Sequence, residues 1–340
     1  MELSKIMKKY LFTLSLATVA IFSGCSSKEV FEPKVVKADW NKQYYVDKGI
    51  IDTTSSAALL NNNEVLVKDG YIETQISDGY RLVSNSDGWV ISSTIDGKTT
   101  LQYIGDKSLT KHLDLKKTIA TVGIKDDLLA VLFADNEMAL YKVSTGELLL
   151  KEQGNAPTVV DSRMAVPFFM NDLVLFSTLD GKIVIINTKL KKKLRTVIVS
   201  TQEYFNNIIY FNVVDNKLII ATSNALMSMS QQEIRSKYEI RNLTHLDNDV
   251  YITTKQGEVI SLTPELQVNA KLKFPFAHFL GLIATDDKVY ALEKEGYIIE
   301  MSRDLSTYNV YEVNIDDGYV FVGDKIFYIN DMAISVDDDK

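Results

Sequence analysis

Short apolar runs, each ending at a turn residue, recur along most of this chain. Some are apolar at consecutive positions, as in Leu173–Phe176, which is typical of strands covered on both faces. Others alternate, as in Ala139–Val143, which is typical of half-buried strands. After residue 45 no segment keeps the i, i+3, i+4, i+7 apolar spacing of a helix. The pattern therefore predicts an all-β domain.

Eight such units can be counted. Their closing residues are Gly70, Gly97, Asn136, Gly181, Asn224, Gly257, Gly296 and Asp331. Most spacings between them are near the ~40 residues of a four-stranded propeller blade. Eight units predict an eight-bladed β-propeller, with seven blades as the alternative. The first spacing, 27 residues from Gly70 to Gly97, is short and predicts a truncated or merged blade near the start.

A second turn rich in Asn and Asp precedes each unit. These residue types and Gly tolerate the positive φ that two-residue hairpin loops require. Adjacent carboxylates such as Asp286 and Asp287 also raise the question of calcium, but the turns lack the ligand-every-second-residue spacing of a calcium loop. We interpret them as hairpin turns and expect no metal site.

Two regions bear on how the ring is completed. The best helical candidate, Ser230–Tyr238, is short, and we expect a loop between strands there. The C-terminal run predicts three strands, Tyr319–Val322, Ile326–Ile329 and Ala333–Val336. A closed ring needs a fourth strand, since an open one leaves an unpaired edge. We expect Lys34–Lys37 to supply that strand.

The N-terminus has the layout of a secretory signal. Lys5, Lys8 and Lys9 precede an uncharged, mostly apolar stretch from Tyr10 to Phe22. Its 13 residues would span only ~20 Å as a helix, less than the ~30 Å hydrocarbon core of a bilayer. The order of basic, apolar and small residues is that of an export signal.

The sequence Phe22-Ser-Gly-Cys25 resembles the bacterial lipobox, which implies lipidation of Cys25 and cleavage just before it. An ordinary secretory signal that happens to contain a cysteine is the alternative. We divide the chain into a signal peptide (1–24), a lipidated tether (25–45) and a propeller (46–340). Ser26 and Ser27, not Asp, follow the cysteine, and the resemblance then implies the outer membrane, with the domain facing the periplasm.

Composition narrows the partners. The chain has 37 basic and 45 acidic residues, so it lacks the excess of basic residues that is typical of nucleic-acid-binding proteins. Cys25 is the only cysteine, so disulfides and thiolate metal sites are excluded. The one basic cluster, Lys189–Arg195, is interpreted as a solvated outer hairpin; a contact patch for an acidic partner or lipid headgroups is the alternative.

Residues Met138–Leu150, with an Ala-Leu pair followed by a Thr-Gly turn, resemble the repeat of the PQQ-like (quinoprotein-like) β-propellers. Leu150 departs from that repeat, where a tryptophan is common. Together with the lipobox and the eight units, the chain is similar to the BamB family of outer-membrane assembly lipoproteins. This resemblance implies a scaffold that assists β-barrel assembly, with protein partners in the outer membrane.

The candidate chemistry favours binding over catalysis. Quinoprotein enzymes of this fold use vicinal cysteines, stacking tryptophans and a calcium site, and this chain offers no such set. His112, His245 and His278 lie in ordinary strand or loop contexts, and no Gly-x-Ser-x-Gly motif is present. We expect no catalytic, cofactor-binding or metal-binding residues. A propeller that binds another ligand, a glycan or a protein, and a quinoprotein enzyme remain the alternatives.

Overall fold

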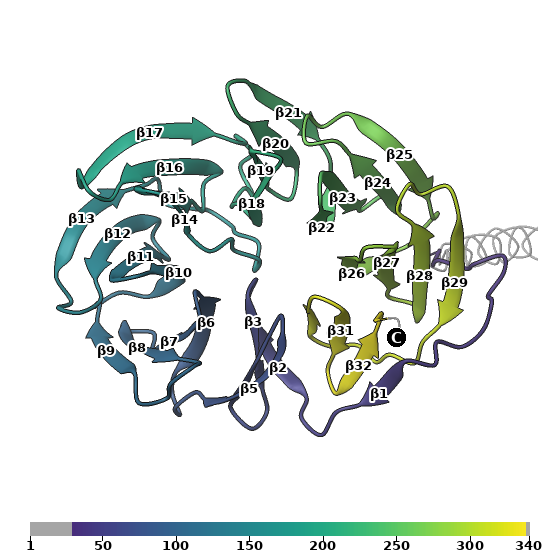
Figure 1. Cartoon of the computed structure of the whole chain (residues 1–340), viewed down its shortest axis with the longest axis horizontal. Helices are drawn as coiled ribbons and strands as arrows, with labels where there is room; N and C mark the ends of the chain where they lie inside the picture. The colour runs from purple at the N-terminus through teal and green to yellow at the C-terminus, as the bar shows by residue number, and fades with distance from the viewer. Residues whose placement is uncertain (1–28, 338–340) are drawn as a thin grey trace, which may run out of the picture.

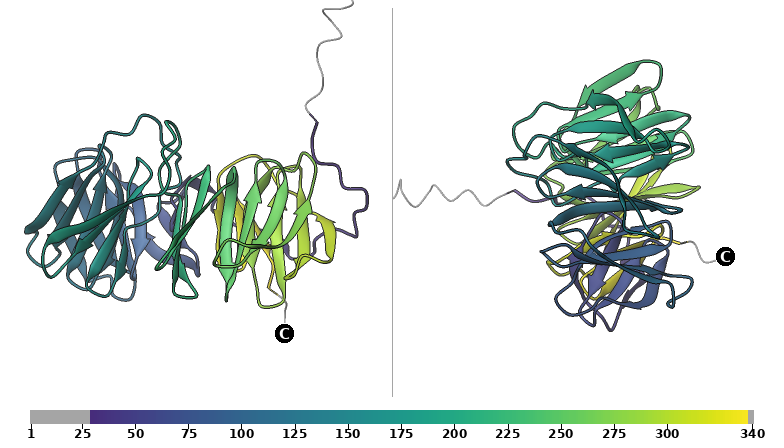
Figure 2. Two further views of the ribbon diagram at one scale, coloured as in Figure 1. Left: turned by 90° about the horizontal axis from the view of Figure 1, so that it is seen from above. Right: turned by 90° about the vertical axis from the view of Figure 1, so that its left-hand side faces the viewer.

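The computed structural model describes residues 29–337, which form 32 strands and no helix. The strands make eight four-stranded antiparallel sheets arranged around a ring (Figure 1). Figure 2 shows that the ring is flattened, with the strands crossing its thickness. The prediction of an all-β, eight-bladed propeller is confirmed.

Each blade runs from an inner strand at the ring's centre to an outer edge strand. The inner strands are β2 (Ile50–Thr53), β6 (Arg81–Ser86), β10 (Ile119–Lys125), β14 (Phe168–Met170), β18 (Tyr210–Val214), β22 (Ile240–Leu246), β26 (Phe279–Ala284) and β30 (Val320–Val322). The second strands are β3 (Ala57–Leu60), β7 (Trp89–Ser93), β11 (Leu128–Phe133), β15 (Leu173–Ser177), β19 (Lys217–Ala221), β23 (Asp249–Thr254), β27 (Lys288–Glu293) and β31 (Ile326–Ile329).

The third strands are β4 (Glu64–Val67), β8 (Lys98–Tyr103), β12 (Glu137–Lys142), β16 (Lys182–Asn187), β20 (Ala225–Met229), β24 (Glu258–Leu262), β28 (Tyr297–Ser302) and β32 (Met332–Ser335). The outer strands are β5 (Gly70–Gln75), β9 (Thr110–Asp114), β13 (Leu148–Gln153), β17 (Lys192–Ile198), β21 (Glu233–Lys237), β25 (Val268–Lys273), β29 (Tyr308–Glu312) and β1 (Gln43–Tyr45). Blades 1 to 8 are numbered by their inner strands in chain order.

The Asn- and Asp-rich turns are hairpin turns, as predicted. Asp87, Asn171 and Asp215 each follow an inner strand and have φ between 47° and 51°. Short polar side chains tolerate this left-handed conformation better than bulky ones do.

The prediction of a truncated or merged first blade is wrong. Gly70 begins the fourth strand of blade 1, after the β4–β5 turn, whereas the other closing residues lie between a second and a third strand. The matching residue is Asn63, with φ of 65°, and it precedes Gly97 by 34 residues. Blade 1 is complete, and the short spacing arose because Gly70 marks a later turn of the blade than the other closing residues do.

An N-terminal strand closes the ring, but not the expected one. The three predicted C-terminal strands are present, and β1 pairs with β32 through Gln43↔Ile334 and Tyr45↔Met332. Lys34–Lys37 form no strand. The Lys37 amide instead donates to the Val310 carbonyl (2.8 Å), which places this segment along β29. The tyrosines of β1 suit a strand better than the lysines around Pro33 do.

The described part of the expected tether is packed against the propeller. Phe31 is only 5% exposed and lies against Phe274 and Tyr297, with ring centroids 6.0 and 5.7 Å away. Trp40 is 7% exposed, and its Nε1 donates to the Ser335 carbonyl (2.8 Å). These residues fix the segment that leads into β1. The predicted signal peptide and Cys25 lie outside the described residues.

The core is divided among the blades. The buried side chains of the described residues form eight apolar clusters, each between two adjacent blades. One cluster joins Ile50 and Leu60 of blade 1 to Phe321 and Tyr328 of blade 8. Ring closure therefore depends on apolar packing between blades 1 and 8 as well as on strand pairing.

Two further predictions concern elements at the outer edge of the ring. The loop expected at Ser230–Tyr238 contains strand β21, so that expectation is wrong. Glu233–Lys237 contains one apolar residue, Ile234, which is 36% exposed, so the segment shows neither an apolar run nor an alternating pattern. The cluster Lys189–Arg195 forms the exposed β16–β17 hairpin, as predicted, and Leu190 is 69% exposed.

Candidate functional site

A cavity of about 770 Å³ lies at the centre of the ring. It is lined by the inner strands of blades 5 to 8, by the β2–β3 turn and by Arg163 from the long β13–β14 connection. A cavity of this size falls within the range of small-molecule and peptide sites.

The β13–β14 connection, residues 154–167, enters the ring and passes close to β3 (Figure 1). Ser55 Oγ donates to the Met164 carbonyl (2.6 Å), which joins the connection to blade 1. Gly123 on β10 makes room for it, because a Cβ there would lie 2.3 Å from the Pro167 carbonyl oxygen. This connection is thus a fixed wall of the cavity.

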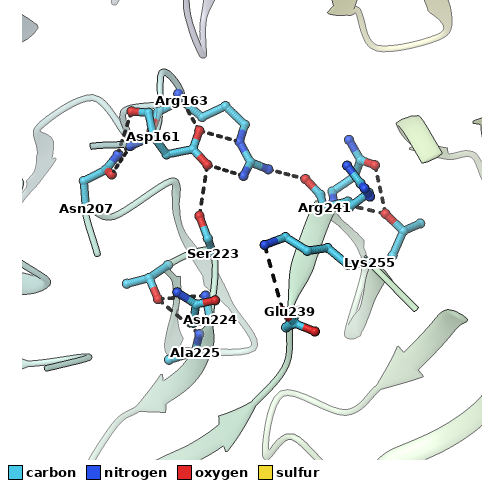
Figure 3. A network of polar contacts seen from close by, with 12 residues as sticks. Asp161, Arg163, Asn207, Ser223, Asn224, Ala225, Glu239, Arg241 and Lys255 are labelled. Atoms are coloured by element: carbon cyan, nitrogen blue, oxygen red, sulfur yellow. Dashed lines mark hydrogen bonds and ion pairs between the residues drawn. The ribbon is translucent and has the colours of Figure 1, made fainter. Parts of the chain in front are cut away.

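A carboxylate network holds Arg163 in place (Figure 3). Asp161 accepts from Arg163 Nε (2.8 Å) and Nη2 (2.5 Å), and from Ser223 Oγ (2.9 Å). The Asn207 amide donates to the backbone carbonyl oxygens of Asp161 and Arg163. Burial alone would raise the pKa of Asp161, but the effect of the Arg163 guanidinium is larger, so the pKa of Asp161 is lowered.

Arg163 in turn reaches the backbone of a second arginine. Its Nη1 donates to the Arg241 carbonyl on β22 (Figure 3). The Arg241 side chain donates through Nη1 to His278 Nε2 (2.8 Å), while its Nε is buried with no hydrogen-bond partner. Burial, and then the nearby Arg163 charge, lower the pKa of Arg241. This end of the cavity is cationic.

Tyr210 and His245 form a neutral pair farther along the wall. The Tyr210 hydroxyl lies 2.7 Å from His245 Nδ1. Burial raises the pKa of Tyr210, and burial together with Lys68 lowers the pKa of His245. A tyrosine that stays protonated and an imidazole that stays neutral provide hydrogen bonds in the cavity without adding charge.

The opposite end carries charges of both signs. Its lining includes Asp286 and Asp287 after β26 and Asp324 after β30, together with Lys68 and Lys325. Burial and Asp69 raise the pKa of Asp324. Asp286 follows Leu280, beside the cationic end, by six residues along and just beyond β26, which corresponds to at most about 20 Å of extended chain. In residues 29–337 no group of three His, Cys, Asp or Glu side chains could hold a metal ion.

The outer edges form a second candidate site, for macromolecules. Exposed edge strands pair readily with other chains, and proteins commonly protect them with charged residues or by covering them. Five outer strands carry basic residues: Lys111 on β9, Lys151 on β13, Lys192, Lys193 and Arg195 on β17, Arg235 and Lys237 on β21, and Lys271 and Lys273 on β25. A sixth, β29, is covered by residues 37–40.

Among the described strands, only the neighbouring β1 and β5 have edges that are neither basic nor covered. Tyr44 and Tyr45 on β1 are 48% and 68% exposed, and Tyr71 on β5 is 46% exposed. The Tyr71 ring centroid lies 5.9 Å from that of Tyr328 on β31 of blade 8. A groove of about 600 Å³, lined in part by Tyr71 and Lys107, continues toward blade 2. We call Tyr44, Tyr45, Tyr71 and these two strands the β1–β5 rim.

The histidines are strand or loop residues, as predicted, but two of them belong to the central region. His112 lies on β9 and contacts Thr100 Oγ1 (3.2 Å). His245 lines the cavity, and His278 contacts Arg241. The sequence analysis did not identify Arg163 or Arg241. The only signal for Arg163 was that residues 154–167 form an unusually long segment without a strand pattern.

The fold defines the class of protein, an eight-bladed β-propeller, and comparisons with known proteins agree. No family model matches the chain. Among solved structures, it is similar to BamB from Moraxella catarrhalis, with a TM-score of 0.65 and 13% identity over 86% of this chain and 97% of that one. It is also similar to the C-terminal WD40 domain of Sif2, with a TM-score of 0.63 and 13% identity over 89% and 100%. At these identities the likeness shows the fold alone.

Two curated relatives share detectable sequence similarity. The plasminogen-binding protein PgbB of Helicobacter pylori strain J99 is 26% identical over 224 residues, which are 61% of this chain and 41% of PgbB. PgbB of strain 26695 matches to the same extent. The chain spans about two-fifths of the length of these relatives. Within residues 29–337, no helix has the length and hydropathy needed to cross a membrane.

Proposed function

We propose that this chain is a lipid-anchored cell-envelope scaffold that binds proteins through the β1–β5 rim and performs no chemistry of its own. The observation that carries this is the rim itself: two adjacent edge strands without basic residues or a cover, bearing three exposed tyrosines. A partner segment would pair with an edge strand through main-chain hydrogen bonds. The tyrosines would supply the aromatic contact area in which protein interfaces are enriched.

As the specific role we propose assistance of β-barrel assembly at the outer membrane, with the propeller facing the periplasm. The lipobox at Phe22–Cys25, the PQQ-like repeat at Met138–Leu150 and the fold shared with BamB support this role. Lipidation at Cys25 would keep the disc close to its partners.

A second candidate function is the binding of an extracellular protein such as plasminogen. The 26% identity to PgbB, whose name describes plasminogen binding, favours it. Both candidate functions require a protein-binding surface. They differ in the identity of the partner and in whether the partner lies in the periplasm or outside the cell.

Affinity capture with rim variants separates these functions. Tyr45→Lys and Tyr71→Lys place charge on the two unprotected edges, and Ile198→Lys on β17, where the side chain is 49% exposed, is the matched control. We expect the wild type and the control to retain β-barrel assembly proteins, and the double rim variant to lose them. Retention of purified plasminogen instead would favour the second candidate. Equal retention by the rim variant and the wild type would refute the rim as the binding surface.

A further inference from the structure

We propose that the Arg241 end of the central cavity is a binding site for a carboxylate group. The site is separate from the rim, so its failure would leave the proposed protein-binding function standing, and the reverse also holds.

Arg241 is a cation without a charged partner. Arg241 is partly buried; among residues 29–337 no carboxylate lies within ion-pair distance of its guanidinium, and its side chain makes one hydrogen bond, to Nε2 of His278. Withdrawing a guanidinium from water costs free energy unless a counter-charge or hydrogen bonds offset that cost. Buried unsatisfied donors such as Arg241 Nε are uncommon in folded proteins.

The charged groups around Arg241 do not balance its positive charge. Arg163, whose charge acts on Arg241, is also a cation, and the carboxylate of its partner Asp161 accepts from Arg163 and from Ser223 Oγ. The acidic residues of the lining, among them Asp286 and Asp324, follow the far ends of the inner strands, and for Asp286 the length of β26 corresponds to about 20 Å. That distance exceeds the ~8 Å Debye length at physiological salt, so these carboxylates do not neutralise Arg241.

The geometry of the free donors selects the ligand chemistry. Nη1 of Arg241 is occupied by His278, which leaves the Nε–Nη2 edge of the guanidinium. Two parallel N–H groups match the two oxygens of a carboxylate. Nε is covered, so a small rotation of the side chain must accompany binding. The ligand is either a small carboxylate or the side chain of an Asp or Glu on a protein segment, and the cavity has room for both.

Calorimetric titration of the purified full-length protein in detergent tests the site. The probes are glutarate, its diamide, a capped Gly-Glu-Gly peptide and the matched Gly-Gln-Gly peptide. We expect saturable binding of glutarate or of the Glu peptide, and none of either amide counterpart. Tighter binding of glutarate identifies a small-molecule site, and tighter binding of the peptide identifies a site for acidic side chains.

Variants locate the binding. Arg241→Gln should weaken it about tenfold or more, since charge-assisted hydrogen bonds contribute roughly 1.5–3 kcal/mol. Arg241→Lys keeps the positive charge and should weaken binding less than Arg241→Gln does. It provides a second test of the site if the glutamine variant does not fold. Arg235→Gln on the outer strand β21 is the control and should leave it unchanged. The proposal is overturned if neither carboxylate binds, if the amides bind equally well, or if both Arg241 variants bind like the wild type.

Discussion

Trp40→Ala should loosen ring closure at blade 8, because this side chain fixes the segment that leads into β1. Trp40 is 7% exposed and packs edge-on against Tyr311 and Tyr290, with centroids 4.9 and 6.0 Å away. Its Nε1 also donates to the Ser335 carbonyl at the end of β32. The substitution therefore removes apolar packing and one hydrogen bond at the point where the N- and C-terminal strands meet.

The size of the effect follows from burial. Truncation of a buried aromatic side chain to Ala costs roughly 3–5 kcal/mol. Trp40 lies near the surface, where a neighbouring segment can relax, so we expect the lower end, about 3 kcal/mol. With an unfolding entropy near 2.1 cal/mol/K per residue, the melting temperature of a domain of this size should fall by about 4–6 °C.

Thermal unfolding and hydrogen exchange together provide the assay. In Trp40→Ala the amides of Met332–Ser335 should exchange faster, because β1 is the edge strand that covers β32. Trp89→Ala in blade 2 is the control: it removes the contact with Tyr103, and exchange in β32 should not change. Unchanged exchange at β32 with a fall in melting temperature below 1 °C would refute the argument.

Further predictions follow from other parts of the chain. Cys25→Ser should abolish fatty-acid labelling, and normal acylation would disprove lipidation at this residue. Gly123→Ala should destabilise the domain by roughly 1–3 kcal/mol in denaturant unfolding, because the new Cβ overlaps the Pro167 carbonyl. The lowered pKa of Asp161 means that its stabilising charge is present above the unfolded pKa of about 3.9 and is lost as the pH falls through the folded value. Asp161→Asn should therefore lower the free energy of unfolding at pH 7, because Arg163 loses its counter-charge. It should also remove part of the loss of stability that the wild type shows below pH 4. A variant whose stability depends on acid pH as that of the wild type does would contradict this.

The blade pattern was predictable because it depends on local chemistry. Runs such as Leu173–Phe176 and turn residues such as Asn171 report strands and hairpins directly, and only Gly70, which marks a later turn of its blade, disturbed the spacing. Outer strands such as β21 were harder, because a solvent-exposed strand needs no apolar pattern.

The site was less predictable because it depends on distant partners. Arg163 and Arg241 are 78 residues apart and meet only when the ring has formed. Likewise, β1 becomes an edge strand only through its pairing with the C-terminal β32, and nothing in the local sequence of Tyr44 and Tyr45 indicates that neighbour. The burial of Phe31 and Trp40 also depends on side chains some 250 residues away.

The central claim is that partners are held at the β1–β5 rim, and a crosslinking scan in living cells tests it most directly. A photoreactive amino acid is placed on each of the eight outer strands in turn, at Tyr45 and Tyr71 on the rim and at exposed positions on the other six, such as Ile198 on β17. We predict strong crosslinks to a single protein partner from the two rim positions and weak or no crosslinks from the others. Crosslinks concentrated on β17 or another basic edge, with none from Tyr45 and Tyr71, would contradict the account.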